Sequence, residues 1–277
     1  MTSEIPWTRI FPDIDHRWIM GLRQGDFATF FRDRDLTGEV RVERRRWFSD
    51  EPEKYAALLP EAAAGMRETC ALARTLGAQV AAVESSPLNQ LLELGPAWEP
   101  DLVWMHPDQN GVHRLLGGAV CFPSSWAMTD MLGRPMSEVH HLVPGLNALL
   151  ARQIDTFLTK LNPGIAWQRE NWGLSRDGNL NHHPSRPRVL LDETIRPDDV
   201  WVRLEHQLLL KLPNSGSVLF GIRLELVPLA DMLADREAAR RFTRLIATMS
   251  PSAAQYKGVA AARPALLAIA EAAEARG

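Results

Sequence analysis

The sequence contains few cysteines and lacks the short motifs of most nucleotide and metal enzymes. Its two thiols, Cys70 and Cys121, are too few for a disulfide framework, a cysteine-built zinc site or an ordinary four-cysteine iron-sulfur cluster. We expect both to be buried apolar fillers. The patterns GxGxxG, GxxxxGK[ST], HExxH, GxSxG and CxxC are all absent, which removes support for standard nucleotide and zinc chemistries.

Long apolar runs and an excess of one charge are also missing. No stretch of about 18 uncharged residues occurs, and Met1 to Phe11 has no apolar run behind a basic start. We therefore expect no membrane span, no signal peptide and a cytoplasmic location. The 31 Lys and Arg residues against 34 Asp and Glu residues give a net charge of -3. Such a balance provides no basic field for nucleic acid or an anionic membrane.

What is present is the composition of an ordinary globular chain. Of 277 residues, 45% are hydrophobic and 23% are charged, which is enough for a substantial core. No internal repeat or low-complexity linker divides the sequence. We expect a single domain over residues 1–277 with helical extensions at both ends.

Residue periodicity predicts both helices and antiparallel strands. Helical composition and spacing occur in Glu51–Leu76, where Pro60 interrupts, and in Asn147–Leu161, Leu229–Met249 and Arg263–Ala273. Alternation and turn residues predict a hairpin from Asp101 to Phe122, a strand over Ile165–Leu174, and a second hairpin that starts with Val200–Leu212. The pattern predicts an α+β fold with an antiparallel sheet of about five strands and with flanking and inserted helices.

Two adjacent histidine pairs, His140–His141 and His182–His183, suggest metal binding at first sight. Neighbouring side chains diverge on a strand or a helix, so each pair supplies at most one ligand to a given ion. The second pair lies in a loop before Pro184, where solvated or hydrogen-bonding roles are the simpler interpretation.

The first pair lies between a predicted strand and a helix, near the apolar residues Met136, Val139 and Val143. A neutral imidazole between apolar walls suits an axial ligand of haem iron. A buried histidine hydrogen-bonded to the backbone is the alternative interpretation.

The strand that begins at Val200 carries a second group of candidates. Alternation puts His206 on the apolar face with Leu204 and Leu208, where it would be a core residue, an iron ligand or a group of the distal pocket. The opposite face carries Arg203, Glu205 and Gln207. A carboxylate between an arginine and an amide suits a cationic amine, and a solvated strand face is the alternative.

The strand over Ile165–Leu174 concentrates aromatic and hydrogen-bonding groups. Alternation puts Arg169 and Asn171 on one face and Trp172 on the other. Arginine binds a haem propionate or a substrate carboxylate in a fork. Trp172 is interpreted either as a core residue or as a cofactor wall.

Taken in order, several segments resemble the alpha-subunit family of haem-dependent oxidative N-demethylases, also described as dimethylamine monooxygenase alpha subunit-like proteins. The resemblance runs from about Asp15 to Gly258. The segments are IDHRWIMGLR, CFPSSW, LGRPMSEVHHLVPGLN, QRENWGL, VRLEHQLLLKLPNSGSVLFGIRLELVPL and AAQYKG.

The resemblance implies a PAS-like fold with haem b, in which iron activates O2 to oxidise a methyl group of a secondary or tertiary amine and formaldehyde is released. It assigns the axial ligand to His140, whereas His206 is the second choice that follows from its place on the strand. From the two strands we also expect Arg169, Asn171, Trp172 and Arg203 at the cofactor, with Arg169 and Arg203 near the propionates. Relatives tend to have arginine at the position of His206 and proline at that of Leu142, and the change at His206 puts dimethylamine itself in doubt.

The sequence hypothesis is a haem b monooxygenase that oxidises a small N-methylated or related amine, with Glu205, His206 and Gln207 on the oxygen and substrate side. Since the chain has no dinucleotide motif and two cysteines, NAD(P)H would act through a separate flavin and iron-sulfur reductase. Three alternatives stay open: a haem-based gas or redox sensor, a biosynthetic haem oxidase with another substrate, and a haem-free enzyme of the same fold. Homo-oligomerisation is also open.

Overall fold

A computed structural model of the chain describes residues 5–32, 35, 37–80 and 85–275. Its centre is a seven-stranded sheet with the order β1-β5-β6-β7-β3-β4-β2, in which all neighbours pair antiparallel. The strands are β1 (Arg23–Gln24), β2 (Ala56–Leu58), β3 (Asp101–Pro107), β4 (His113–Ala119), β5 (Ala166–Ser175), β6 (Trp201–Lys211) and β7 (Val218–Pro228). The ends of the expected single domain, residues 1–4 and 276–277, lie outside the described residues.

The prediction of an α+β fold is confirmed, whereas the prediction of about five strands is wrong. Both expected hairpins and the expected single strand are present as β3–β4, β6–β7 and β5. The two additional strands, β1 and β2, have two and three residues and are too short to show alternation. The PAS-like plan implied by the resemblance stays a prediction.

The expected helix over Glu51–Leu76 is wrong in its first half. The chain forms α4 (Pro52–Tyr55), then β2, then a 3-10 turn at Pro60–Ala62, and only then α5 (Ala63–Thr75). Pairing with β4 decides this outcome, because β2 takes its partners Ala119, Gly118 and Gly117 from a distant part of the chain. A local composition rich in alanine and leucine does not reveal such pairing.

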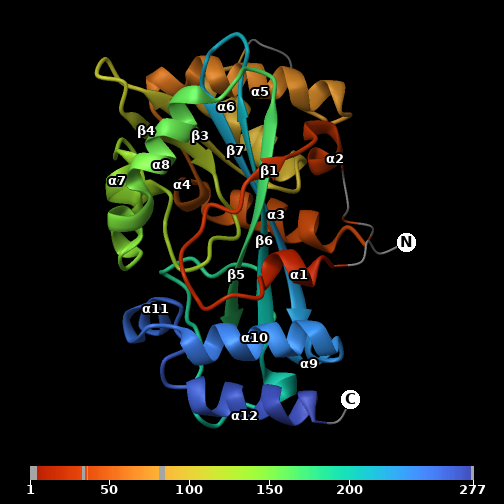
Figure 1. Cartoon of the computed structure of the whole chain (residues 1–277). Coiled ribbons are helices and arrows are strands. Elements are labelled where there is room, and N and C mark those ends of the chain that lie inside the picture. The colour runs from red at the N-terminus through yellow and green to blue at the C-terminus, as the bar shows by residue number, and fades with distance from the viewer. Residues whose placement is uncertain (1–4, 33–34, 36, 81–84, 276–277) are drawn as a thin grey trace.

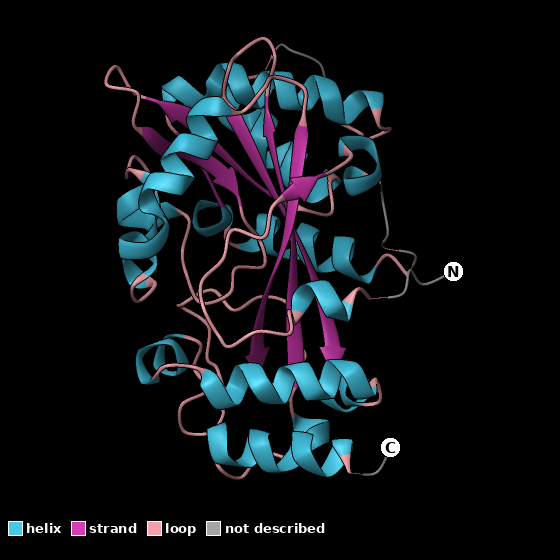
Figure 2. Cartoon of the chain, viewed as in Figure 1, coloured by secondary structure: helices cyan, strands magenta, loops and turns pink. Residues whose placement is uncertain are grey.

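Helices cover both faces of the sheet and one end of its long strands (Figures 1 and 2). One face packs on α3 (Glu39–Asp50), α5 and α6 (Pro87–Ala97), and the other on α7 (Met136–Val139) and α8 (Leu146–Lys160). Near the ends of β5, β6 and β7 lie α9 (Leu229–Leu233), α10 (Arg236–Thr248), α11 (Pro251–Tyr256) and α12 (Arg263–Glu274). Two further short α-helices are α1 (Trp7–Ile10) and α2 (Phe27–Phe31). The other predicted helices are confirmed, with Leu229–Met249 divided into α9 and α10.

The N-terminal segment is held against distant parts of the chain. The carboxylate of Asp13 accepts hydrogen bonds from Arg240 and Arg244 of α10. Farther along, the indole Nε1 of Trp18 donates to the carbonyl of Pro144 at 2.7 Å. Next to it, Gly145 adopts a φ of +72° and precedes the first residue of α8, a conformation that a residue with a Cβ rarely takes. These contacts bring Trp18 beside the start of α8.

Among the described residues, no helix combines the length and the apolar character that a bilayer crossing requires.

Candidate functional site

The register of β5 and β6 gathers four polar side chains on one face of the sheet. Arg169 pairs with Gln207 and Asn171 pairs with Glu205. Because paired residues of antiparallel strands point to the same side, all four share the face that α7 and α8 cover farther along the sheet. The predicted grouping of Arg169 with Asn171 and of Glu205 with Gln207 therefore agrees with the observed register.

Two amide groups hold the carboxylate of Glu205 in place. Asn171 Nδ2 donates to Glu205 Oε2 at 3.1 Å, and Gln207 Nε2 donates to the same oxygen at 2.9 Å. Within the described part of the chain, Oε1 receives no hydrogen bond. One oxygen is thus used for orientation, and the other retains its capacity to accept a hydrogen bond from a ligand.

Arg169 lies on the same face of the sheet as this carboxylate. Its guanidinium has no partner among the described protein residues. Its Nε is buried and makes no hydrogen bond, and the described residues offer no carboxylate within ion-pair distance of the group. Burial lowers the pKa of Arg169, and the negative charges of Glu205 and Glu170 oppose that effect. A buried donor without a hydrogen bond is costly for a fold, and a half-buried guanidinium without a protein acceptor suits an anionic ligand such as a carboxylate.

His140 belongs to a 3-10 turn, His140–Leu142, between α7 and α8. Burial lowers the pKa of its imidazole, and the positive charge of Arg169 lowers it further. The ring is therefore neutral at pH 7, which is the form that ligates a metal. His141 is exposed, so the pair behaves as expected for neighbours that diverge.

Three residues to which the sequence analysis gave no role complete the surroundings. Lys257, directly after α11, donates from Nζ to the carbonyl of Trp172 at 2.6 Å and lies 5.7 Å from the Trp18 ring centroid. Tyr256 packs edge-on against Trp18 with 5.9 Å between ring centroids. The signals were the AAQYKG and IDHRWIMGLR segments, which suggested the family but not what these side chains contact.

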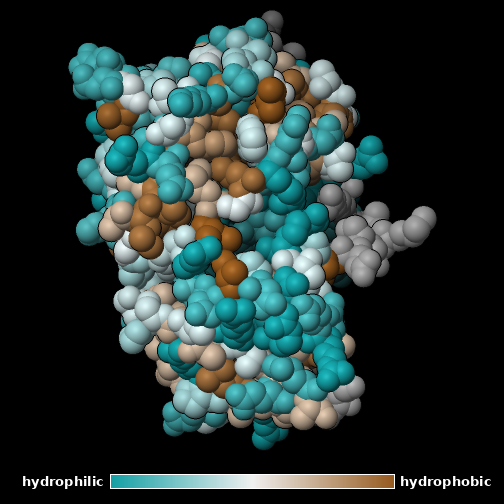
Figure 3. Space-filling model, in the orientation of Figure 1, coloured by the Kyte–Doolittle hydropathy of each residue, from teal (hydrophilic) through white to brown (hydrophobic). Residues whose placement is uncertain are grey.

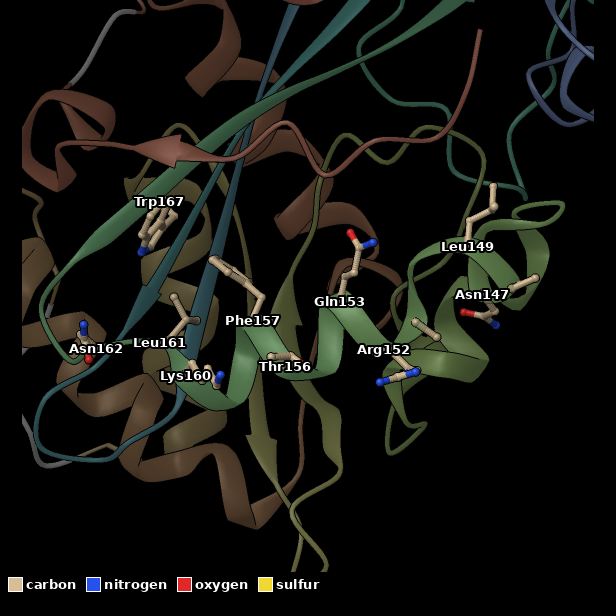
Figure 4. Close-up of a pocket in the computed structure, with 12 residues that line it drawn as sticks. Asn147, Leu149, Arg152, Gln153, Thr156, Phe157, Lys160, Leu161, Asn162 and Trp167 are labelled. Carbon is tan, nitrogen blue, oxygen red and sulfur yellow. The ribbon is translucent and has the colours of Figure 1, made fainter.

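An open groove of about 740 Å³ runs along α8 next to this cluster. Figure 4 shows Phe157 projecting from α8 toward Trp167 of β5, and their rings meet edge-on at 5.8 Å. Trp167 shares its face of β5 with Arg169. Apolar side chains are visible among polar ones on the surface that carries α7 and α8 (Figure 3). Leu142 and Leu149 there are 59% and 60% exposed.

The structure does not bring His206 and Trp172 to this cluster, because both point to the opposite face of the sheet. His206 lies in a polar stretch of that face and not among the apolar residues expected, with its Nε2 3.0 Å from Glu225 Oε2. Trp172 is a core residue whose ring packs edge-on against Phe11 and Phe242. Of the two interpretations of Trp172, the structure favours the core.

Arg203 shares the face of Glu205, but its guanidinium is already bound. It donates to the carbonyls of Asn179 and Leu180 at 2.7 and 2.8 Å and is 2% exposed. Burial lowers its pKa to about 10. Arg203 therefore fixes the loop between β5 and β6, which also contains the buried pair His182 and His183.

His182 and His183 form hydrogen bonds within that loop, which agrees with the hydrogen-bonding role expected from the sequence. His182 Nε2 lies 2.9 Å from Asp177 Oδ1, and His183 Nδ1 lies 2.9 Å from Ser185 Oγ. Burial lowers the pKa of both imidazoles. The two thiols, Cys70 and Cys121, are buried and free as expected.

The residues present fit a haem group. In the described ranges, no three His, Cys, Asp or Glu side chains cluster closely enough to hold an ion, but a haem iron requires only one or two protein ligands. His140 offers a neutral imidazole, and the Arg169 guanidinium without a hydrogen-bond partner suits a propionate. The groove along α8 is of the size typical of sites for drug-sized ligands and cofactors, and it reaches Trp167 on the same face of β5 as Arg169, although neither His140 nor Arg169 lines it.

The fold and the site together define an α+β protein with a ligand site built on one face of its antiparallel sheet. A sequence model of one family, described as haem-dependent oxidative N-demethylase, alpha subunit-like, matches residues 52–267. The chain belongs to this family. The resemblance identified from the sequence is thereby confirmed, and the family description indicates a haem-dependent oxidoreductase and an enzyme with further subunits.

Proposed function

We propose that the protein is a haem b monooxygenase that oxidises a small N-methylated amine with O2 and releases formaldehyde and the demethylated amine. The observation that carries the proposal is the convergence of a neutral imidazole, an unpaired guanidinium and an oriented carboxylate at His140, Arg169 and Glu205. These groups supply one iron ligand, one propionate contact and one contact for an ammonium group.

His140 and Arg169 would hold the cofactor. An imidazole that stays neutral at pH 7 has a free nitrogen lone pair for iron. The buried Nε of Arg169 makes no hydrogen bond, and a propionate would supply an acceptor for the guanidinium. When bound, haem supplies the activation of O2 that amino-acid side chains do not provide.

Glu205 would bind and orient the amine. Its Oε1 is free to accept a hydrogen bond from a substrate N–H, while Asn171 and Gln207 keep the carboxylate from rotating. The roles proposed for Asn171 and Gln207 are therefore positioning roles. His206, Trp172 and Arg203 are left out of this assignment, because two of them lie on the other face and the third is bound to backbone carbonyls.

Electrons would reach the site from a separate protein. The family description names an alpha subunit, and the chain lacks a dinucleotide motif and the four cysteines of an iron-sulfur cluster. We propose that NAD(P)H acts through a flavin and iron-sulfur reductase that docks on this chain.

The test is the absorption spectrum of the protein produced with adequate haem supply, before and after dithionite and carbon monoxide. We expect a Soret band that shifts with carbon monoxide, and reductant consumption that depends on an added methylated amine. His140→Ala should retain less than about a tenth of the haem, because an axial ligand and its orienting contacts are lost.

His141→Ala, a change at the exposed neighbour, is the matched control and should retain haem fully. Full occupancy with an unchanged spectrum in His140→Ala would remove the ligand assignment. Haem binding without amine-dependent reductant consumption would favour the gas or redox sensor. The absence of a Soret band even after hemin addition would contradict both and favour the haem-free alternative.

A further inference from the structure

The chain uses lysine sparingly, and one lysine has an unusual environment. Only Lys54, Lys160, Lys211 and Lys257 occur among its 31 cationic residues. Lys257 is half-buried, and its Nζ lies 4.2 Å from the Trp172 ring centroid and 5.7 Å from that of Trp18. An arginine could make the same aromatic contacts and hydrogen bond, but a guanidinium is not a nucleophile at neutral pH.

The position of Lys257 connects it to the cluster on β5 and β6. Its Nζ donates a hydrogen bond to the carbonyl of Trp172. The preceding residue, Asn171, donates a hydrogen bond to Glu205. Only one of the Lys257 N–H groups is used in the contact with Trp172. The amine therefore lies against β5, one residue along from Asn171, and the charge of Glu205 acts on it.

Charged neighbours on each packed element act on the Lys257 amine. Burial lowers its pKa to about 8, Arg169 on β5 lowers it as well, and Glu205 on β6 opposes both effects. His16 of the N-terminal segment is kept neutral by burial and by the Lys257 charge, which lower its pKa to about 4. Tyr256 has a raised pKa and stays protonated. A desolvated lysine beside another cation is the arrangement that activates amines for covalent chemistry.

We propose that Lys257 is a nucleophilic amine site that condenses reversibly with a small aldehyde. The neutral amine attacks the carbonyl carbon, a C–N bond forms, and the oxygen takes a proton to give a carbinolamine. Loss of one water molecule then leaves an imine, and no oxidant or reductant is consumed. Glu205, the carboxylate whose charge acts on Lys257, would exchange the protons. The inference rests on the proposed function only for the source of the aldehyde, which would be the formaldehyde released by demethylation.

The experiment measures the reactivity of each lysine in the purified protein directly. The protein is treated at pH 7.5 with formaldehyde and sodium cyanoborohydride, which converts an imine to a methylated amine, and initial rates are read by peptide mass mapping. The N-terminal amine, whose ordinary pKa is close to 8, is resolved on its own peptide. Lys160, exposed on α8, is the internal control.

We expect Lys257 to be methylated at least about tenfold faster than Lys160. A pKa near 8 raises the neutral fraction at pH 7.5 by about two powers of ten over an ordinary lysine, and lower basicity offsets part of this gain. Glu205→Gln should move the midpoint of the rate against pH to lower pH, and Arg169→Met should move it to higher pH. A structural lysine would show neither shift.

Equal rates at Lys257 and Lys160, or a midpoint that moves in neither variant, would overturn the inference. The labelling needs no amine substrate, oxygen or electron donor, so it is independent of the demethylation test. Selective labelling without demethylase activity would contradict only the proposed function, and activity without selective labelling would contradict only the aldehyde site.

Discussion

Glu205 illustrates how hydrogen bonding at one residue decides what a carboxylate can do. Both amide donors, from Asn171 and Gln207, bind the same oxygen and leave the second one available. Glu225, by comparison, accepts a contact from His206 on the opposite face of the sheet. The two glutamates therefore form a matched pair for testing the amine site.

Glu205→Gln should weaken binding of a small methylammonium ligand by about 1.5 to 3 kcal/mol, the range for a hydrogen bond to a charged group. The substitution removes the negative charge of the side chain and leaves its shape unchanged. Isothermal titration of the haem-loaded protein measures the effect.

Glu225→Gln is the control, because it removes a carboxylate that faces away from the proposed site, and it should leave ligand affinity unchanged. Equal affinity in both variants would return Glu205 to a structural role.

At the scale of elements, one buried ion pair joins a helix to the sheet. Arg44 of α3 is fully buried and donates from Nη1 to Asp101 Oδ1 at 2.6 Å and from Nε to the carbonyl of Gly95 in α6. Asp101 also accepts the backbone N–H groups of Cys121 and Phe122 just after β4. The Arg44–Asp101 pair thus fixes α3, α6, β3 and the chain after β4 relative to one another.

Arg44→Met should lower the free energy of unfolding by about 3 to 5 kcal/mol, because it leaves Asp101 buried without its counter-charge. Chemical denaturation at pH 7 measures the change.

Arg46→Met on the same helix is the control. Arg46 is 57% exposed, lies over the Trp47 ring and pairs with the exposed Glu43 and Asp50, so its loss should stay within about 0.5 kcal/mol. If both variants lost a similar free energy of unfolding, burial would not make the Arg44–Asp101 pair more stabilising than an exposed pair.

At the scale of the whole molecule, histidines buried in the neutral form link stability to pH. Burial is the first cause of a lowered pKa at five of them: His16, His113, His140, His182 and His183. In the unfolded chain each would return to a pKa of about 6.5. Below that pH the unfolded state binds more protons than the folded state, so acid favours unfolding.

The free energy of unfolding should therefore fall as the pH decreases from about 6.5 to 4.5, by up to about 1.4 kcal/mol per pH unit for each histidine. Asp13 and Glu237, whose pKa values are lowered to about 2 by arginine hydrogen bonds, contribute mainly at still lower pH. Denaturation curves at several pH values measure the slope. His16→Phe keeps a ring beside Trp18 and should reduce the slope, whereas a stability that is flat from pH 7.5 to 5 would contradict the linkage.

The sequence by itself determined the long strands and which side chains share a face. Alternation is a local property, so the grouping of Arg169 with Asn171 and of Glu205 with Gln207 could be predicted from β5 and β6 alone. The family followed from ordered segments, and the matched residues 52–267 confirm it. The short strands β1 and β2 were not predicted, because a segment of two or three residues is too short to show a periodic pattern.

Only the tertiary structure decided what surrounds each face. Alternation put His206 with leucines, but Glu225 of the neighbouring strand makes its surroundings polar. The charge of Arg169 acts on His140, and Lys257 contacts Trp172 and Trp18, because chain segments far apart in sequence pack together. Burial and charge, which set the pKa values and leave Arg169 without a hydrogen-bond partner, exist only once those segments meet.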